Sequence, residues 1–262
     1  MESIKAIGFD LFNTLITADK GAVDEAVRRL TKKLHQDGLD FEDDMFYITY
    51  RKTALEFVER AEKDGIETHN RFWISATLHK LGFRINPDDQ RIADALVSYF
   101  SAFFDYCHLI PGTISMLNCV RSGYRLAMLS NFTHGPACRG LVDHFGLSSF
   151  FDVILVSGEL GYRKPHPGVF NRLVDELDVK PDSVIYVGDN LEADVMGALN
   201  AGIKPVWFTY AKDKRVEMVP GDRGREIRDP EFDVVTVRDW DSFLELLEDS
   251  RILPGCKETF GD

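Results

Sequence analysis

Residues 4–15 read IKAIGFDLFNTL, an apolar run of strand length that ends on a carboxylate, Asp10. The chain contains further short runs that are nearly continuous in apolar residues: 124–131, 151–157, 183–189, 204–210 and 232–237. A run without alternating polar residues is typical of a strand covered on both faces, as in a parallel sheet. The sequence therefore predicts a buried parallel sheet whose first strand, 4–10, ends at Asp10.

Segments of helix length separate most of these predicted strands. They are 111–123, 166–179, 192–202 and 240–249. Strands that alternate with helices need crossover connections, which are right-handed in nearly all proteins. We therefore predict an α/β fold built on a doubly wound parallel sheet.

Residues 16–106 interrupt this alternation. They show no convincing strand pattern but four helical ones: 22–36, 43–65, 71–82 and 88–105. We predict two domains, an α/β core formed by residues 1–15 and 107–262 and an inserted all-helical domain formed by residues 16–106. The connections near 15–17 and 106–108 are expected to act as hinges that open and close the helical domain.

The composition limits the partners of the protein. Its 262 residues carry a formal net charge of −12, which disfavours binding to nucleic acid and to anionic lipid. No apolar run approaches the ~20 residues that span a bilayer, and the first residues do not form a secretory signal. The four cysteines form no CxxC pair and no cluster with zinc-ligand spacing, so we expect reduced thiols rather than a disulfide framework. We expect a cytoplasmic monomer or homodimer that binds a small anionic substrate, and neither nucleic acid nor membrane.

Three of the predicted strands end in a carboxylate or a hydroxyl, at Asp10, Ser130 and Asp189. Parallel strands bring their carboxyl ends to one edge of the sheet, which is where ligands bind in open α/β sheets. Lys164 follows the 151–157 strand and is expected to reach the same edge. Acids, a hydroxyl and an amine in one crevice suit a carboxylate nucleophile, a divalent cation and a lysine that holds an anionic substrate.

These residues lie in four motifs through which the chain resembles the haloacid dehalogenase-like (HAD) hydrolase superfamily over nearly its whole length. The motifs are, in order, DLFNT with Asp10, LSN with Ser130, RKPHP with Lys164, and GDNLEAD with Asp189 and Asp194. The helical insert directly after the first motif is similar to the cap of the helical-cap (type C1) subgroup. The resemblance implies a Rossmann-like core and a hydrolase activity.

The resemblance also implies roles for the matched residues. Asp10 would be the nucleophile, and Ser130 would hydrogen-bond the transferring group. Lys164 would hold the charge of that group, while Asn131 and Thr14 would bind the substrate.

A cofactor, Mg²⁺, is implied as well. The resemblance assigns its ligands to Asp10, the backbone carbonyl of Phe12, Asp189 and Asp194. Carboxylate and carbonyl oxygens are the ligands that Mg²⁺ prefers. Taken alone, Asp194 is equally well explained as a carboxylate that is favoured near the N-terminus of the predicted helix 192–202.

Phe12 departs from the pattern of the superfamily's phosphatases. Those enzymes have an Asp two positions after the nucleophile, which protonates the leaving group and then activates water. Phe can do neither, and the loss of a positioned acid/base typically costs ~10²–10⁴ in rate. The 2-haloacid dehalogenases of the superfamily have an aromatic Tyr there and use no metal, but they have Ser and Asn where this chain has Asp189 and Leu191.

Three interpretations therefore stay open. The favoured one is a Mg²⁺-dependent phosphatase that acts on a small phosphorylated metabolite through an aspartyl-phosphate. The second is a 2-haloacid dehalogenase-type hydrolase that uses Asp10 as nucleophile without metal. The third is a catalytically weakened binding or regulatory domain. Two histidines, His69 and His134, receive no role from the sequence.

Overall fold

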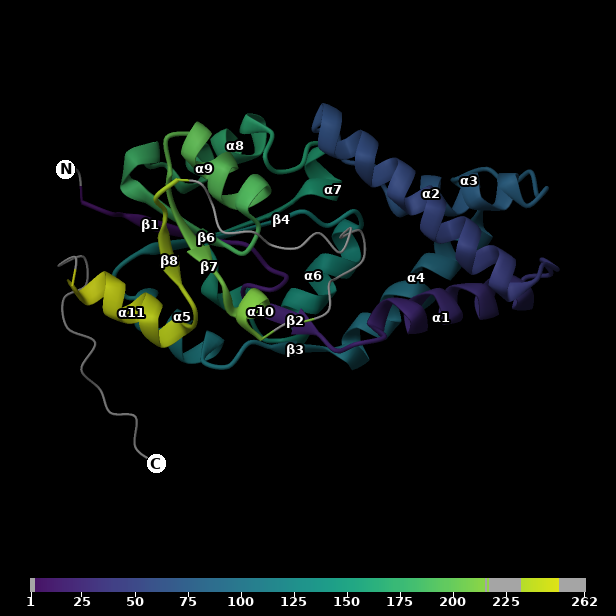
Figure 1. Ribbon diagram of the computed structural model, residues 1–262, viewed down its shortest axis with the longest axis horizontal. Coiled ribbons are helices and arrows are strands. Elements are labelled where there is room, and N and C mark those ends of the chain that lie inside the picture. Colours follow the sequence, from purple (N-terminus) through teal and green to yellow (C-terminus); the bar gives the residue numbers. More distant parts are fainter. Residues whose placement is uncertain (1–2, 215, 217–231, 250–262) are drawn as a thin grey trace.

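The computed structural model describes residues 3–214, 216 and 232–249 of the chain. Its centre is a parallel sheet of six strands in the order β5-β4-β1-β6-β7-β8 (Figure 1). The strands are β1 (Ala6–Phe9), β4 (Arg125–Ser130), β5 (Val153–Val156), β6 (Val184–Gly188), β7 (Lys204–Phe208) and β8 (Val235–Val237). The chain runs outward from β1 in both directions, so the fold is the predicted doubly wound α/β sheet.

Helices cover both faces of this sheet (Figure 1). On one face lie α8 (Pro167–Leu177) and α9 (Gly197–Asn200), and on the other lie α5 (Thr113–Val120), α6 (Gly135–His144) and α11 (Trp240–Asp249). The side chains of β1 alternate between the two layers: Ile7 and Phe9 belong to one apolar core, and Ala6 to the other. The buried runs lack polar residues because both of their faces are covered.

Four helices follow one another between residues 22 and 106, as the sequence predicts. They are α1 (Ala22–Gln36), α2 (Asp43–Asp64), α3 (Asn70–Lys80) and α4 (Gln90–Tyr106). They extend away from the carboxyl end of the sheet, on the side of α6 and α7 (Ser157–Leu160) (Figure 1). We call them the helical segment.

The expectation that residues 16–106 contain no strand is wrong at one end. A short strand, β2 (Ile16–Ala18), pairs antiparallel with β3 (Cys107–Leu109). The two connections to the helical segment are therefore hydrogen-bonded to each other as a ribbon. Three residues are too few for a strand pattern to stand out, and the partner strand lies about ninety positions away in the sequence.

Other local expectations need correction. Helix α6 was not expected, and the predicted helix 192–202 begins as a π-helical segment, Leu191–Met196, before it becomes α9. Residues 210–213, expected in part as strand, form the short helix α10 (Tyr210–Asp213). Short 3₁₀ turns lie at Ser148–Phe150 and Pro181–Ser183.

The cysteines differ from the expectation of reduced thiols. Cys107 and Cys138 are free and buried, whereas Cys119 is disulfide-bonded, so the expectation of four reduced thiols is wrong. Among the described residues, no helix is long and apolar enough to cross a bilayer.

Candidate active site

A lysine lies between two carboxylates at the carboxyl end of the sheet. The Nζ atom of Lys164 is 2.5 Å from Oδ1 of Asp10, which follows β1, and 2.6 Å from Oδ1 of Asp194. All three residues are buried, with exposed fractions of 3%, 7% and 1%. Burial opposes the charge on Lys164, but the two carboxylates outweigh it and raise the pKa of the lysine well above its usual value.

Asp189 completes a cluster of three acids. Ligand oxygens of Asp10, Asp189 and Asp194 all lie within 4.8 Å of one another. Burial raises the pKa of Asp10 to about 6, against the opposing effect of Lys164. Burial and the charges of Asp10 and Asp194 raise the pKa of Asp189 well above its usual value. Three carboxylates against one ammonium leave excess negative charge, which a divalent cation with oxygen ligands would compensate.

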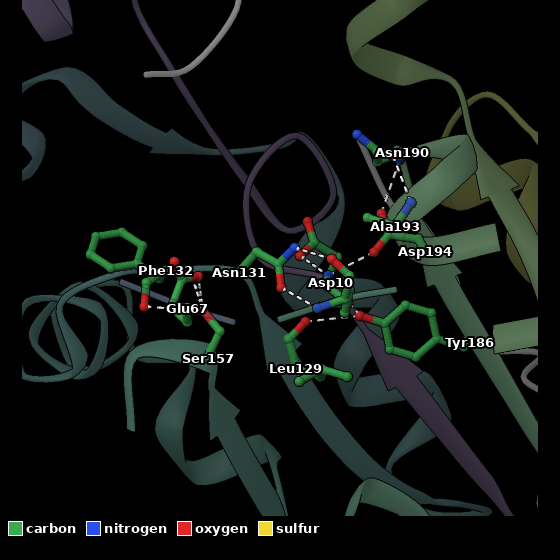
Figure 2. A network of polar contacts seen from close by, with 11 residues as sticks. Asp10, Glu67, Leu129, Asn131, Phe132, Ser157, Tyr186, Asn190, Ala193 and Asp194 are labelled. Atoms are coloured by element: carbon green, nitrogen blue, oxygen red, sulfur yellow. Dashed lines mark hydrogen bonds and ion pairs between the residues drawn. The ribbon is translucent and has the colours of Figure 1, made fainter. Parts of the chain in front are cut away.

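The loop after β6 is built to hold Asp194 in place. Oδ2 of Asp194 accepts the Asn190 N–H at 2.9 Å, and the Asn190 side chain accepts the Ala193 N–H at 2.8 Å (Figure 2). The same Asn190 oxygen also accepts the Glu192 N–H at 3.0 Å. Gly188 is needed here because a Cβ atom would lie 2.3 Å from Cγ of Asp194. Asp194 therefore closes its own loop with one oxygen and faces Lys164 with the other.

Tyr186 is a site residue that the sequence reasoning missed. Its hydroxyl accepts a hydrogen bond from Nζ of Lys164 at 3.0 Å and donates one to the Leu129 carbonyl at 2.8 Å. Gly8 on the neighbouring strand makes room, because a Cβ atom there would lie 2.7 Å from the Tyr186 ring. The available signal was a tyrosine in a fully buried strand, where the hydroxyl needs a partner.

The second motif lies beside the lysine. Ser130 is the last residue of β4 and is buried. The Asn131 side chain holds the backbone of Lys164 from both sides, since its amide donates to the Lys164 carbonyl at 2.9 Å and its oxygen accepts the Lys164 N–H at 2.8 Å. In the part of the chain that the structure describes, the buried Thr14 hydroxyl has no hydrogen-bond partner.

The ring of Phe12 belongs to an aromatic cluster. The ring stacks on Phe132 at a centroid distance of 5.8 Å and meets the edge of Phe103, from α4, at 6.1 Å. The ring centroid of Phe100, also from α4, lies 5.3 Å from that of Phe132. At the position where the phosphatases have an acid, this chain therefore places an apolar contact between the helical segment and the core.

His69 from the helical segment and His134 from the core are in contact, with ring centroids 5.0 Å apart. Each ring caps a helix: Nδ1 of His69 accepts the Arg71 N–H at 3.1 Å, and Nδ1 of His134 accepts the Ala137 N–H at 3.0 Å. Burial, followed by the charges of His134 and Arg71, lowers the pKa of His69 to about 4, and burial lowers that of His134. The two unassigned histidines are neutral capping residues at neutral pH.

Comparison with known proteins bears on this site. The family model described as "haloacid dehalogenase-like hydrolase" matches residues 4–202. The glyceraldehyde 3-phosphate phosphatase of Pyrococcus furiosus is 28% identical over 83% of this chain and 86% of that protein. The N-acylneuraminate-9-phosphatase of Mus musculus is 29% identical over 79% of this chain and 84% of that protein.

A solved structure shares the fold. The 2-haloacid dehalogenase from Pseudomonas syringae pv. tomato DC3000 superposes with a TM-score of 0.68 and 18% identity, over 94% of this chain and 99% of that one. At this identity the likeness concerns the fold alone. From the family match and the four motifs in their places along the sheet, the chain belongs to the haloacid dehalogenase-like hydrolases.

Proposed function

We propose that this hydrolase is a Mg²⁺-dependent phosphatase that acts on a small phosphorylated metabolite through a phosphoryl group carried on Asp10. The observation that carries the proposal is the acid cluster, in which Asp10, Asp189 and Asp194 lie within 4.8 Å of one another beside Lys164. A metal-free dehalogenase that binds a carboxylate substrate has no use for three acids, because they would repel it. Two relatives named as phosphatases of small phosphate esters support the same conclusion.

The acids fit the cation well. Asp10, Asp189 and the backbone carbonyl of Phe12 would hold Mg²⁺, with Asp194 beside them directly or through water. When bound, the ion neutralises phosphate oxygens and favours the ionised form of Asp10, whose pKa is otherwise raised to about 6.

The first chemical step transfers the phosphoryl group to the protein. An oxygen of Asp10 forms a bond to phosphorus as the bond from phosphorus to the leaving oxygen breaks. The ammonium of Lys164 and the hydroxyl of Ser130 hold the other phosphate oxygens. The leaving oxygen takes its proton from water, because Phe12 has none to give.

The second step returns the enzyme to its first state. Water attacks phosphorus, the bond between Asp10 and phosphorus breaks, and inorganic phosphate leaves. Without an acid/base at position 12, this water is poorly activated. Substrates with good leaving groups, such as aryl and acyl phosphates, should then react faster than alkyl esters, and the phosphorylated enzyme should accumulate as a burst.

We also propose that the helical segment, with its connections residues 16–106, is a cap that closes over the site as a domain of its own. Two observations support it: the buried state of Asp10, Lys164 and Ser130, and the ribbon of β2 and β3 through which both connections pass. A closed cap excludes water from the first step and must open to exchange substrate and product.

A substrate panel tests the activity. Aryl, acyl and alkyl phosphates and 2-chloropropionate are incubated with wild-type protein, either in Mg²⁺ or in chelator. Phosphate release that needs Mg²⁺ is the expected result. Chloride release in chelator, without phosphate release from any ester, would instead establish the dehalogenase alternative.

Calorimetry tests the cation separately. Asp189→Asn should weaken Mg²⁺ binding by at least roughly 10- to 100-fold, the loss that is typical even for residues that only orient a metal ligand. Asp182→Asn, an exposed acid before β6, is the matched control and should bind Mg²⁺ like the wild type. Equal binding by wild type and Asp189→Asn would remove the metal from the proposal.

A further inference from the structure

Glu67 is a buried acid outside the catalytic cluster. It lies in the loop between α2 and α3, at the edge of the cap, and is only 9% exposed. Its Oε2 atom accepts a hydrogen bond from the Ser157 hydroxyl at 2.6 Å, and its Oε1 atom accepts the Thr68 N–H at 3.0 Å. The Nη1 atom of Arg163 lies 3.7 Å from Oε1. Apart from Thr68, these partners belong to the core.

The backbone around Glu67 is paired with the core as well. The Glu67 N–H donates to the Gly161 carbonyl at 3.0 Å, and the Arg163 N–H donates to the Gly65 carbonyl at 3.0 Å. Ile66 and Tyr162 thus form an antiparallel bridge. The cap loop is hydrogen-bonded along the segment that leads directly into Lys164.

Ser157 extends the contact to the second motif. Its oxygen accepts the Phe132 N–H at 2.9 Å while its hydroxyl donates to Glu67 (Figure 2). Phe132 follows Asn131, whose side chain holds the backbone of Lys164. Glu67 therefore contacts both core segments that position the lysine.

Opening of the helical segment would break these contacts. Asp10 is 7% exposed and Lys164 is 3% exposed, so both reacting groups are nearly enclosed while the α2–α3 loop is seated on the core. Movement of the α2–α3 loop away from the core separates Glu67 from Ser157 and Arg163 from Gly65.

We infer that Glu67 is the latch of the cap, a positioning residue that seats the α2–α3 loop on the segments carrying Asn131 and Lys164 when the site is closed. The function of the latch, though not its existence, rests on the proposed phosphatase activity. The latch is reversible, because the carboxylate exchanges protein hydrogen bonds for water when the loop lifts. Closure of the cap and placement of the lysine are then one event.

Backbone amide exchange tests the latch without any assay of activity. In Glu67→Ala, the Arg163 amide, which bonds to the cap loop, and the Phe132 amide should exchange roughly 10- to 100-fold faster, the cost of hydrogen bonds to a charged group. The amides of β6 report global opening and should change much less. Glu56→Gln is the matched control, because Glu56 pairs with Lys80 inside the cap.

Two further variants separate a latch from a general packing role. Glu67→Gln keeps an oxygen that can accept from Ser157, so it should recover most of the protection of these amides. Ser157→Ala should accelerate exchange as Glu67→Ala does, and the double variant should be no faster than the faster single variant. Additive effects, or equal acceleration of the β6 amides, would overturn the latch.

The rate at which vanadate binds in the presence of Mg²⁺ links the latch to the site. This rate should rise in Glu67→Ala, because opening limits entry, and return toward the wild-type value in Glu67→Gln. An unchanged rate in Glu67→Ala would refute control of access by Glu67. If wild-type protein binds no vanadate, the proposed function fails, while the exchange experiment still decides whether the latch exists.

Discussion

Two ionic clusters of this protein have opposite compositions. One places an acid between two bases, and the other places a base between two acids. In the helical segment, Glu25 lies between Arg28 and Arg29, and the Arg28 side chain is 61% exposed. In the core, Lys164 lies between Asp10 and Asp194, and its side chain is 2% exposed.

The difference lies in what surrounds the charges. Hydrogen bonds from Arg28 and Arg29 lower the pKa of Glu25 to about 2, with water available to every partner. Burial raises the pKa of Asp10 to about 6, although a lysine is in contact with it. Exposed pairs contribute little to stability, whereas a buried cluster with excess charge is costly and is kept where it has a chemical use. The buried cluster around Lys164 therefore marks the candidate site, and the exposed cluster around Glu25 does not.

The largest expected effect comes from the core cluster. Asp10→Asn keeps the shape of the side chain but removes the nucleophile, so phosphate release should fall by at least about 10⁴-fold. Steady-state assays with an aryl phosphate measure this. An Asp10→Asn variant with even a tenth of wild-type activity would show that another group attacks phosphorus.

Phe12→Asp restores the acid that the phosphatases of the superfamily have. We expect turnover of alkyl phosphates to rise by at least about 10-fold, since a positioned acid/base is worth ~10²–10⁴. The same change removes the ring contacts with Phe103 and Phe132, and should lower the free energy of unfolding by about 2 kcal/mol.

Phe12→Asn separates these two effects. It loses the same packing but supplies no acid, so it should be destabilised to a similar extent without any gain in alkyl phosphate turnover. Chemical denaturation and kcat for paired aryl and alkyl substrates give both quantities. If turnover of alkyl phosphates rose equally in both variants, the gain would come from the lost packing of the Phe12 ring and not from the new acid.

A smaller effect is expected from His69, where the helical segment meets the sheet domain. Its pKa is lowered to about 4 from an ordinary 6.5, so the folded state binds fewer protons than the unfolded state between these values. Its contribution to stability is therefore present above pH 6.5 and is lost as the pH falls toward 4. Because the ring is partly exposed, we expect the loss to be about 1 kcal/mol at pH 5.

His69→Asn isolates this contribution, because Asn also caps helix N-termini and does not titrate. Wild type and variant should have similar free energies of unfolding at pH 7.5. At pH 5 the variant should be the more stable by about 1 kcal/mol, as measured by urea denaturation. A difference between the two proteins that does not change with pH would show that His69 titrates normally.

The smallest effect is expected at the exposed cluster around Glu25. Glu25→Gln should change the free energy of unfolding by less than about 1 kcal/mol, and the difference from wild type should shrink in high salt. Phosphate release should stay at the wild-type level. A loss of activity here would show that the surface cluster is coupled to the site, against the contrast between the two clusters.

Much of the architecture was predictable because buried parallel strands and long helices leave local patterns. The strand ends at Asp10, Ser130 and Asp189 follow from the same patterns, since parallel strands share one carboxyl edge. The helical segment could also be located, because about ninety residues without a convincing strand pattern are unusual after a first strand.

The rest depends on contacts between distant parts of the chain. Three contacts join positions that no local pattern relates: the pairing of β2 with β3, the hydrogen bond between Ser157 and Glu67, and the hydrogen bond between Lys164 and Tyr186. Phe12 is the clearest case. The sequence shows that an acid is missing there, but only the structure places the ring between Phe103 and Phe132.

The central claim is that Asp10 carries the phosphoryl group. Wild-type protein is mixed with an aryl phosphate in Mg²⁺, quenched with acid during the burst, and digested for mass spectrometry. We expect one added phosphoryl group on Asp10, formed as fast as the burst and absent in Asp10→Asn. Phosphate release with no phosphorylated Asp10 at any time in the burst, or with the group on another residue, would contradict it.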